Sequence, residues 1–164
     1  MITKEQLAAS MIRECDVCVH LFGKLTPDAY TYRPSPTQRT TLDLLRYLSI
    51  CGIASLRCMA EQNWNLFGDF AARSREMPAA DFPAAMERQK TEIAAFFDSI
   101  DEHTLETQAA PLPTGGTAPL GVAILNGPFK WIAAYKLQLF LYTKTTSASD
   151  IGTANAWAGV DRKV

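Results

Sequence analysis

The sequence contains few histidines and no long apolar run, and each shortage argues against a class of protein. Histidine occurs twice among the 164 residues, at His20 and His103, so one chain cannot supply a three-histidine metal site. The longest apolar stretch, LQLFLY at 137–142, is far shorter than the roughly 20 residues that span a bilayer. The N-terminal MITKEQLAAS lacks the charged and then apolar pattern of a signal peptide. We therefore expect a cytoplasmic protein with no membrane-spanning helix.

The sequence also lacks any concentration of positive charge. Its 16 Lys and Arg residues are balanced by 17 Asp and Glu residues, for a formal net charge of -1. No basic cluster is dense enough to follow a phosphate backbone, so we expect no nucleic-acid partner. The serine-hydrolase motif G-x-S-x-G and the phosphate-loop ending G-K-S/T are missing too, so neither chemistry has support.

Four cysteines are present, but their spacing does not favour a metal site. Cys51 and Cys58 lie two helical turns apart, about 10 Å along a helix axis, so they cannot both bind one zinc ion without breaking the helix. Cys15 and Cys18 lie inside a predicted helix rather than at its start, where thiol pKa values are lowered. We interpret all four as small buried apolar residues.

Apolar residues at helical spacing dominate what is present. Thr3 and Gln6 fit a capping box at the start of the first helix, and Asp81 fits the N-cap of the third. We find no convincing strand alternation, so the pattern indicates an all-α, four-helix bundle. The length fits one domain over residues 1–164. The periodicity predicts long helices at about residues 4–22, 41–61, 82–100 and 120–145.

Glycine and proline divide the rest of the chain. APLPTGGTAP predicts a long loop before the last helix, and N-G-P at 126–128 should break or kink that helix. The tail from Ser147 is rich in small residues but contains Ile151 and Trp157. A lone tryptophan in a tail indicates that the tail docks on the bundle.

The stretch KWIAAYKLQLFLYTK places Trp131, Tyr135, Gln138 and Tyr142 at spacings of four, three and four. On a helix these residues share one face, which is either a packed core stripe or the wall of a site. The lysines of the same region should face solvent; they are Lys130, Lys136 and Lys144.

Two segments resemble the DinB-like superfamily, four-helix bundles that include bacterial damage-inducible proteins and thiol-dependent transferases. YRPSPTQRTTLDLLRYLSICG is similar to the family's proline-containing approach to helix 2. WIAAYKLQLFLYTK is similar to its last helix, commonly H-x-x-x-H-x-x-Q, and the long loop before that helix also fits. The resemblance covers nearly the whole chain and implies a homodimer that pairs through helices.

Active members of that family hold a divalent metal with three histidines, and the resemblance assigns those positions to Tyr47, Trp131 and Tyr135. Gln138 keeps the family's glutamine. An indole nitrogen is only a donor, and a neutral phenol is a poor ligand for a divalent ion. We therefore expect no metal and no cofactor, and no basis for metal-assisted thiol chemistry.

Three functions remain open at this point, and catalytic residues are unknown. The first is an uncharacterised DinB-like protein that binds a small molecule, without metal, at the former metal site. The second is a transferase that uses non-standard residues, such as Cys51, Cys58 or a tyrosine. The third is a structural or interaction dimer whose former site is plugged by side chains. The predicted pocket consists of Tyr47, Cys51, Trp131, Tyr135 and Gln138.

Overall fold

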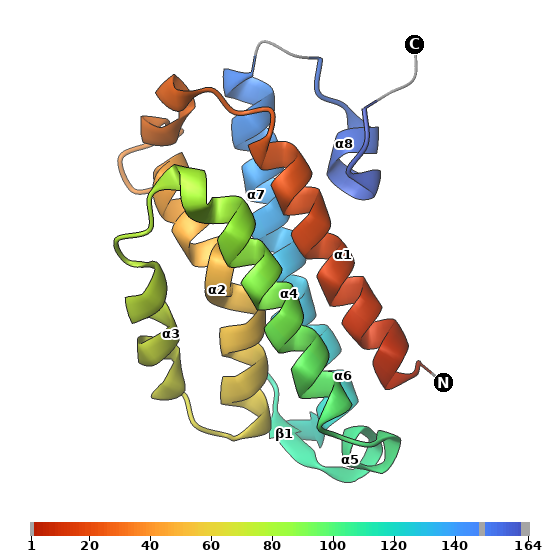
Figure 1. Ribbon diagram of the computed structural model, residues 1–164. Helices are drawn as coiled ribbons and strands as arrows, with labels where there is room; N and C mark the ends of the chain where they lie inside the picture. The colour runs from red at the N-terminus through yellow and green to blue at the C-terminus, as the bar shows by residue number, and fades with distance from the viewer. Residues whose placement is uncertain (1, 148–149, 162–164) are drawn as a thin grey trace.

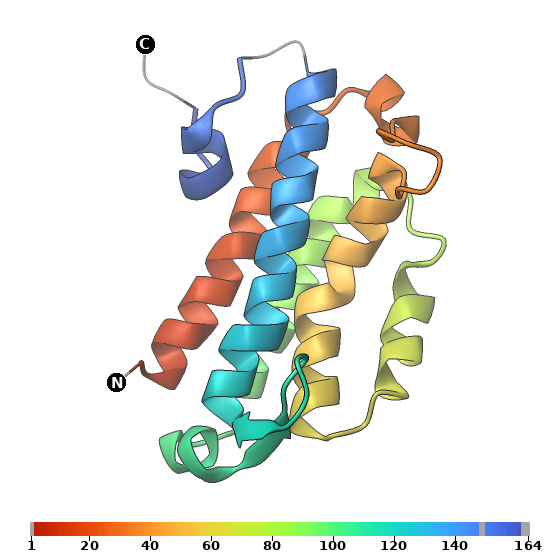
Figure 2. The ribbon, with the colours of Figure 1, turned by 180° about the vertical axis from the view of Figure 1, so that it is seen from behind.

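Four long helices lie side by side in the computed structural model, which describes residues 2–147 and 150–161 (Figures 1 and 2). The helices α1 and α2 each pack against both α4 and α7, so α1 and α2 lie at opposite corners of the bundle. The predicted all-α four-helix bundle is confirmed. The long helices are α1 (Lys4–Phe22), α2 (Thr41–Ala60), α4 (Phe82–Asp98) and α7 (Lys130–Thr146).

Shorter elements connect the long helices. The 3₁₀ turn η1 (Pro27–Thr31) precedes α2. Between α2 and α4 lie α3 (Leu66–Ser74) and the 3₁₀ turn η2 (Ala79–Asp81). Between α4 and α7 lie α5 (Glu102–Thr107), β1 (Ala109–Pro111), β2 (Thr117–Pro119), α6 (Leu120–Ile124) and the π-helical turn η3 (Leu125–Phe129). The last element is α8 (Thr153–Ala158). No helix in the described ranges is both long and apolar enough to cross a membrane.

Side-chain caps start the first two long helices. The Thr3 hydroxyl accepts from the Gln6 backbone N–H, and the Gln6 side chain accepts from the Thr3 N–H, so the capping box forms as predicted. Thr40 caps α2 by accepting from the N–H of Asp43. Asp81 is the N-cap residue of α4, as predicted, but its side chain accepts no helix N–H, and η2 leads directly into the helix.

The segment before α7 contains more structure than a loop. Residues 109–119 form a short antiparallel hairpin, with Ala110 paired to Ala118. Gly115 and Gly116 make its turn at φ +91° and +79°, which residues with a Cβ rarely adopt. Three-residue strands are too short to show alternation in a sequence. The expectation of a loop without strands was therefore wrong here.

The N-G-P segment does not end the last helix. It forms the π-helical turn η3, and the chain runs on from α6 into α7. A wider turn suits Pro128, which has no N–H to donate and whose ring crowds the preceding turn. A Cβ added at Gly127 would lie 2.6 Å from Met59 Cε, so the glycine lets η3 pack closely on α2.

A buried amide joins α4 to α2 inside the core. Gln89 Oε1 accepts from the N–H of Gly52 at 2.9 Å, and Gln89 Nε2 donates to the carbonyl of Leu48 at 2.9 Å. Leu48 and Gly52 are the i and i+4 positions of one helical turn, so the amide bridges a pair that ordinarily bond each other. A Cβ at Gly52 would lie 3.1 Å from Gln89 Oε1.

The tail docks on the bundle, as predicted, but Trp157 is not the residue that anchors it. α8 packs against α1 and α7, and Asn155 and Ala156 of this helix and Ile151 before it are buried, whereas Trp157 is 73% exposed. Asn155 donates to His20 Nε2 at 3.0 Å, and Arg13 donates to the carbonyl of Ala158. Residues 148–149 and 162–164 of the predicted tail lie outside the described residues.

Lys136 was predicted to face solvent, and this was wrong. The residue is 4% exposed, and its Nζ lies 2.6 Å from a carboxylate oxygen of Glu14 on α1. The ring of Trp157 lies 5.2 Å from the same Nζ. Lys136 is therefore enclosed where α1, α7 and α8 meet.

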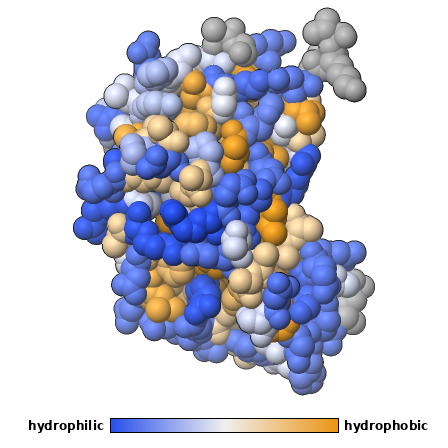
Figure 3. Space-filling model, viewed as in Figure 1, coloured by the Kyte–Doolittle hydropathy of each residue, from blue (hydrophilic) through white to orange (hydrophobic). Residues whose placement is uncertain are grey.

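The exposed hydrophobic residues are unevenly distributed. On the face of Figure 3 they form separate patches among hydrophilic residues. Figure 2 shows α7 in front of α1 and α2. On α7, Leu137 and Leu141 are 51% and 53% exposed.

Candidate functional site

Tyr47 on α2 and Tyr135 on α7 lie together, as the resemblance implied. Their ring centres are 4.6 Å apart at 64°, an edge-to-face arrangement that aromatic pairs prefer. The guanidinium carbon of Arg39 lies 4.4 Å from the Tyr47 ring centre and 5.2 Å from that of Tyr135. Phe67 on α3 lies 6.2 Å from Tyr47. The rings therefore fill part of the space between the helices.

Trp131 lies one helical turn before Tyr135 and packs against Trp64. The two indole rings are 5.8 Å apart and tilted by 57°, and Trp64 is 46% exposed. Trp64 comes from the segment that joins α2 to α3. We call Arg39, Tyr47, Trp64, Trp131 and Tyr135 the aromatic cluster.

Gln138 hydrogen-bonds to Tyr142 rather than to Tyr47 or Tyr135. Its Nε2 donates to the hydroxyl of Tyr142 at 2.6 Å, and that hydroxyl donates to the carbonyl of Arg39 at 3.1 Å. The Tyr142 ring also packs edge-on against Tyr32 at 5.4 Å. This chain of hydrogen bonds ties the approach to α2 onto α7.

Gln138 and Tyr142 line a groove of about 440 Å³ between α7 and residues 32–38, which we call the α7 groove. Leu137 and Leu141 form its outer wall, and Ala134 also lines it. Ala134 lies three residues after Trp131, and residues at that spacing share a helix face. The α7 groove therefore approaches the aromatic cluster along one side of α7.

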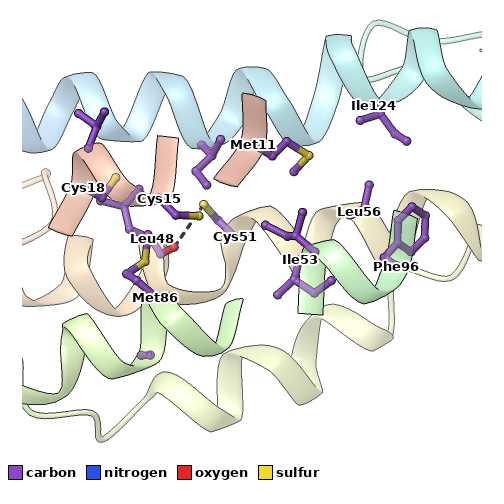
Figure 4. Close-up of a cluster of buried hydrophobic side chains, with 14 of the residues drawn as sticks. Met11, Cys15, Cys18, Leu48, Cys51, Ile53, Leu56, Met86, Phe96 and Ile124 are labelled. Atoms are coloured by element: carbon purple, nitrogen blue, oxygen red, sulfur yellow. Dashed lines mark hydrogen bonds between the residues drawn. The ribbon is translucent and has the colours of Figure 1, made fainter. Parts of the chain in front are cut away.

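Cys51 does not form the wall of an open site. It is fully buried beneath Tyr47, and Figure 4 shows its sulfur beside that of Cys15 from α1. Burial raises the pKa of the Cys51 thiol to about 12, against smaller opposing effects of local hydrogen bonds and Arg39. The thiolate, which is the nucleophilic form, is therefore scarce at neutral pH. All four cysteines are buried and free.

The polar groups of the aromatic cluster are mainly hydrogen-bond donors. Burial raises the pKa of the Tyr47 phenol, and the nearby Cys51 and Tyr135 raise it further while Arg39 opposes them. Tyr47 is therefore a neutral phenol at neutral pH. The indole N–H of Trp131 can donate but not accept.

The residues at the three projected metal positions do not fit a divalent metal. Trp131 offers no lone pair to a metal, and the raised pKa of Tyr47 opposes the phenolate that would be a better ligand. Within the described part of the chain, no group of three His, Cys, Asp or Glu residues lies close enough to hold an ion.

Sequence reasoning missed Arg39, Trp64 and Phe67. Their segments were predicted to be connections, and no periodicity links them to the long helices. The one available signal was composition, since NWNLF places Trp64 and Phe67 close together in a connection.

No protein-family model matches the sequence, and no curated protein matches it either. Among solved structures, the bundle matches the crystal structure of YjoA, a DinB-like protein from Bacillus subtilis, with a TM-score of 0.69. The alignment covers 90% of this chain and 96% of that one. The chain has a DinB-like fold. At 16% identity, the likeness to this DinB-like protein concerns the arrangement of helices and not the side chains of the site.

Proposed function

We propose that this DinB-like protein acts as one domain over residues 1–164 and binds a small molecule without a metal. The ligand would lie along α7, between the aromatic cluster and the inner end of the α7 groove. The observation that carries the proposal is the cluster itself, where Trp64 and Trp131 reach the surface one helical turn from Tyr135, a ring that the guanidinium of Arg39 contacts. Aromatic walls with a few placed polar groups are typical of small-molecule sites.

The size of the α7 groove also supports binding. Its volume of about 440 Å³ lies within the roughly 300–1,000 Å³ of ligand pockets. Gln138 and Tyr142 supply polar atoms in its wall, while Leu137 and Leu141 supply apolar surface. A planar ligand could therefore rest on Trp131 and extend toward Gln138.

A thiol-dependent transferase is less well supported. Cys51 and Cys58 are buried, and burial raises the pKa of both thiols. A substrate would have to enter the core to reach them. Free, buried cysteines instead suit a protein in a reducing compartment, and we propose a cytoplasmic location on that basis.

The indole N–H signals of the three tryptophans provide a direct test in an NMR spectrum. Small aromatic compounds that bind at the cluster should shift the signals of Trp64 and Trp131. The signal of Trp157, on α8, should not move and serves as an internal control. Tryptophan-to-phenylalanine variants assign the three signals. A panel of compounds that moves none of them, or moves Trp157 alone, would contradict the proposal, as would stoichiometric zinc or nickel in the purified protein.

A homodimer is the second candidate function, and the exposed leucines of α7 favour it. Leu137 and Leu141 are about half exposed and line the α7 groove, so a second copy could cover the same surface. The resulting contact would pair the α7 helices about a two-fold axis.

Sedimentation distinguishes this dimer from the monomeric binder. A dimer paired through the groove should dissociate in the Leu137→Glu/Leu141→Glu double variant. Val160→Glu changes a similarly exposed apolar residue outside the groove and should leave the dimer intact. A wild-type protein that stays monomeric at micromolar concentration would remove this candidate.

A further inference from the structure

Arg39 combines two features among the arginines of the described residues, because it lies over aromatic rings and its charge is not matched by a carboxylate. Arg46, Arg57 and Arg73 each lie within ion-pair distance of an acidic side chain. Within residues 2–147 and 150–161, Arg39 forms no ion pair. Its guanidinium instead lies over the rings of Tyr47 and Tyr135.

The ring contacts position the guanidinium of Arg39 but do not provide hydrogen-bond acceptors for its N–H groups. A guanidinium carries five N–H donors, and cation–π contact leaves those donors able to bind an acceptor. The Arg39 side chain is the donor in none of the hydrogen bonds of the described residues. An ordered arginine with free donors at the protein surface favours an anionic partner.

The neighbouring groups favour the same kind of partner. Tyr47 is a neutral phenol that can donate, and the indole N–H of Trp131 has no acceptor within the described part of the protein. Arg39 is the charged side chain that acts on the buried groups here, since it lowers the pKa of both Tyr47 and Cys51 against the effect of burial. A ligand with acceptor atoms therefore fits this surface better than a cation.

We propose that the ligand is a planar organic anion, an aromatic carboxylate, whose charge binds Arg39 and whose ring packs on Trp131 and Trp64. The inference rests on the proposed function and adds the chemical class of the ligand. Arg39 supplies charge-assisted hydrogen bonds to the carboxylate oxygens, because a guanidinium matches the geometry of a carboxylate. The exposed edge of Trp64 leaves room for the ring to approach.

Benzoate and benzamide test the proposal, since they share a ring and differ in charge. Both are titrated at neutral pH into wild-type protein and followed by the indole signals of Trp64 and Trp131. Benzoate should bind about tenfold more tightly, which corresponds to about 1.4 kcal/mol. Arg39→Gln should abolish that difference. The matched control is Arg33→Gln, which changes an exposed arginine in the same segment and should preserve it.

The outcomes separate the two proposals. Equal binding of benzoate and benzamide, with both indole signals shifting, would overturn the anionic class and leave small-molecule binding intact. A preference for benzoate that survives in Arg39→Gln would overturn the role of Arg39. If neither compound shifts either signal, the anionic ligand and the proposed function both fail.

Discussion

Among the cations that lie over aromatic rings in the described residues, Arg39 and Lys136 have very different surroundings. Arg39 lies over two tyrosine rings at the exposed end of α2. Lys136 lies beneath the ring of Trp157, almost without solvent exposure, and its Nζ meets the carboxylate of Glu14. Both arrangements use the attraction between a cation and the face of an aromatic ring.

The difference lies in where the charge is neutralised. Glu14 neutralises Lys136 inside the protein, and the ion pair lies where α1, α7 and α8 meet. Arg39 has a ring on one side and no carboxylate within the described residues. The same type of contact therefore accompanies a neutralised charge on one face of α7 and a charge without an ion-pair partner on the other.

Removal of the carboxylate that neutralises Lys136 should have the largest effect. Glu14→Gln leaves the buried ammonium of Lys136 without its counter-ion, and we expect the free energy of unfolding to fall by roughly 3 kcal/mol. Urea denaturation measures the loss. Glu61→Gln is the control, because the pair between Arg57 and Glu61 is exposed and should contribute less than about 1 kcal/mol. Similar losses in the two variants would mean that the buried pair of Lys136 and Glu14 contributes no more to stability than the exposed pair of Arg57 and Glu61.

Removal of the ring above Lys136 should have a smaller effect. Trp157 is largely exposed, so Trp157→Ala should lower the free energy of unfolding by about 1 kcal/mol through the lost cation–π contact. The measurement is again urea denaturation, with Val160→Ala as a control on the neighbouring exposed surface. A loss as large as that of Glu14→Gln would show that the ring, rather than the carboxylate, stabilises the ammonium.

The attachment of α8 should weaken in acid. Burial lowers the pKa of His20, with Asp161 and Lys24 acting in opposite directions. The folded-state pKa of His20 lies below the unfolded value of about 6.5. The stabilisation of the folded state by neutral His20 is therefore complete above about pH 6.5, and it is lost as pH falls from there through the lower, folded-state pKa. The protonated ring also loses the hydrogen bond that Nε2 accepts from Asn155.

The indole signal of Trp157 should therefore change as pH falls below about 6.5. We expect the free energy of attachment of α8 to fall by less than about 1 kcal/mol. His20→Gln retains an acceptor near Asn155 and removes the titration, so it should flatten the profile. A pH dependence that persists in this variant would assign the effect to another group.

Removal of the positive charge of Arg39 should affect stability least. Arg39→Gln should lower the free energy of unfolding by about 0.5 kcal/mol, the lower limit for exposed cation–π contacts. The variant should therefore remain folded while its preference for benzoate disappears. If the free energy of unfolding instead fell by about 2 kcal/mol or more, which is typical of buried polar contacts, Arg39 would be a structural residue. The contrast with Lys136 would then not hold.

The fold was predictable to the extent that it depends on local signals. Periodicity located the long helices, and the capping box at Thr3 and Gln6 located the start of α1. The environment of Lys136 was not predictable, because its carboxylate partner lies on α1 and its aromatic cover lies on α8, both distant in sequence. The hairpin at 109–119 was missed because its strands are only three residues long.

The candidate site was predictable in part. The pairing of Tyr47 with Tyr135 followed from the superfamily resemblance and from adjacent helix faces. The rotation of Gln138 toward Tyr142 depends on a hydroxyl and on the carbonyl of Arg39, which no periodicity reveals. Whether these residues bind a ligand stays a prediction for the experiments above.

The amide of Gln89 couples two positions that lie far apart in the chain. Gly52 leaves space for this amide beside α2, and the amide hydrogen-bonds to the N–H of Gly52 and the carbonyl of Leu48. A methyl group at Gly52 would crowd the glutamine, and a shorter side chain at position 89 would leave those backbone groups without their partner. During evolution, we therefore expect the two positions to change together, and a search for distant relatives could use this pair as a joint marker.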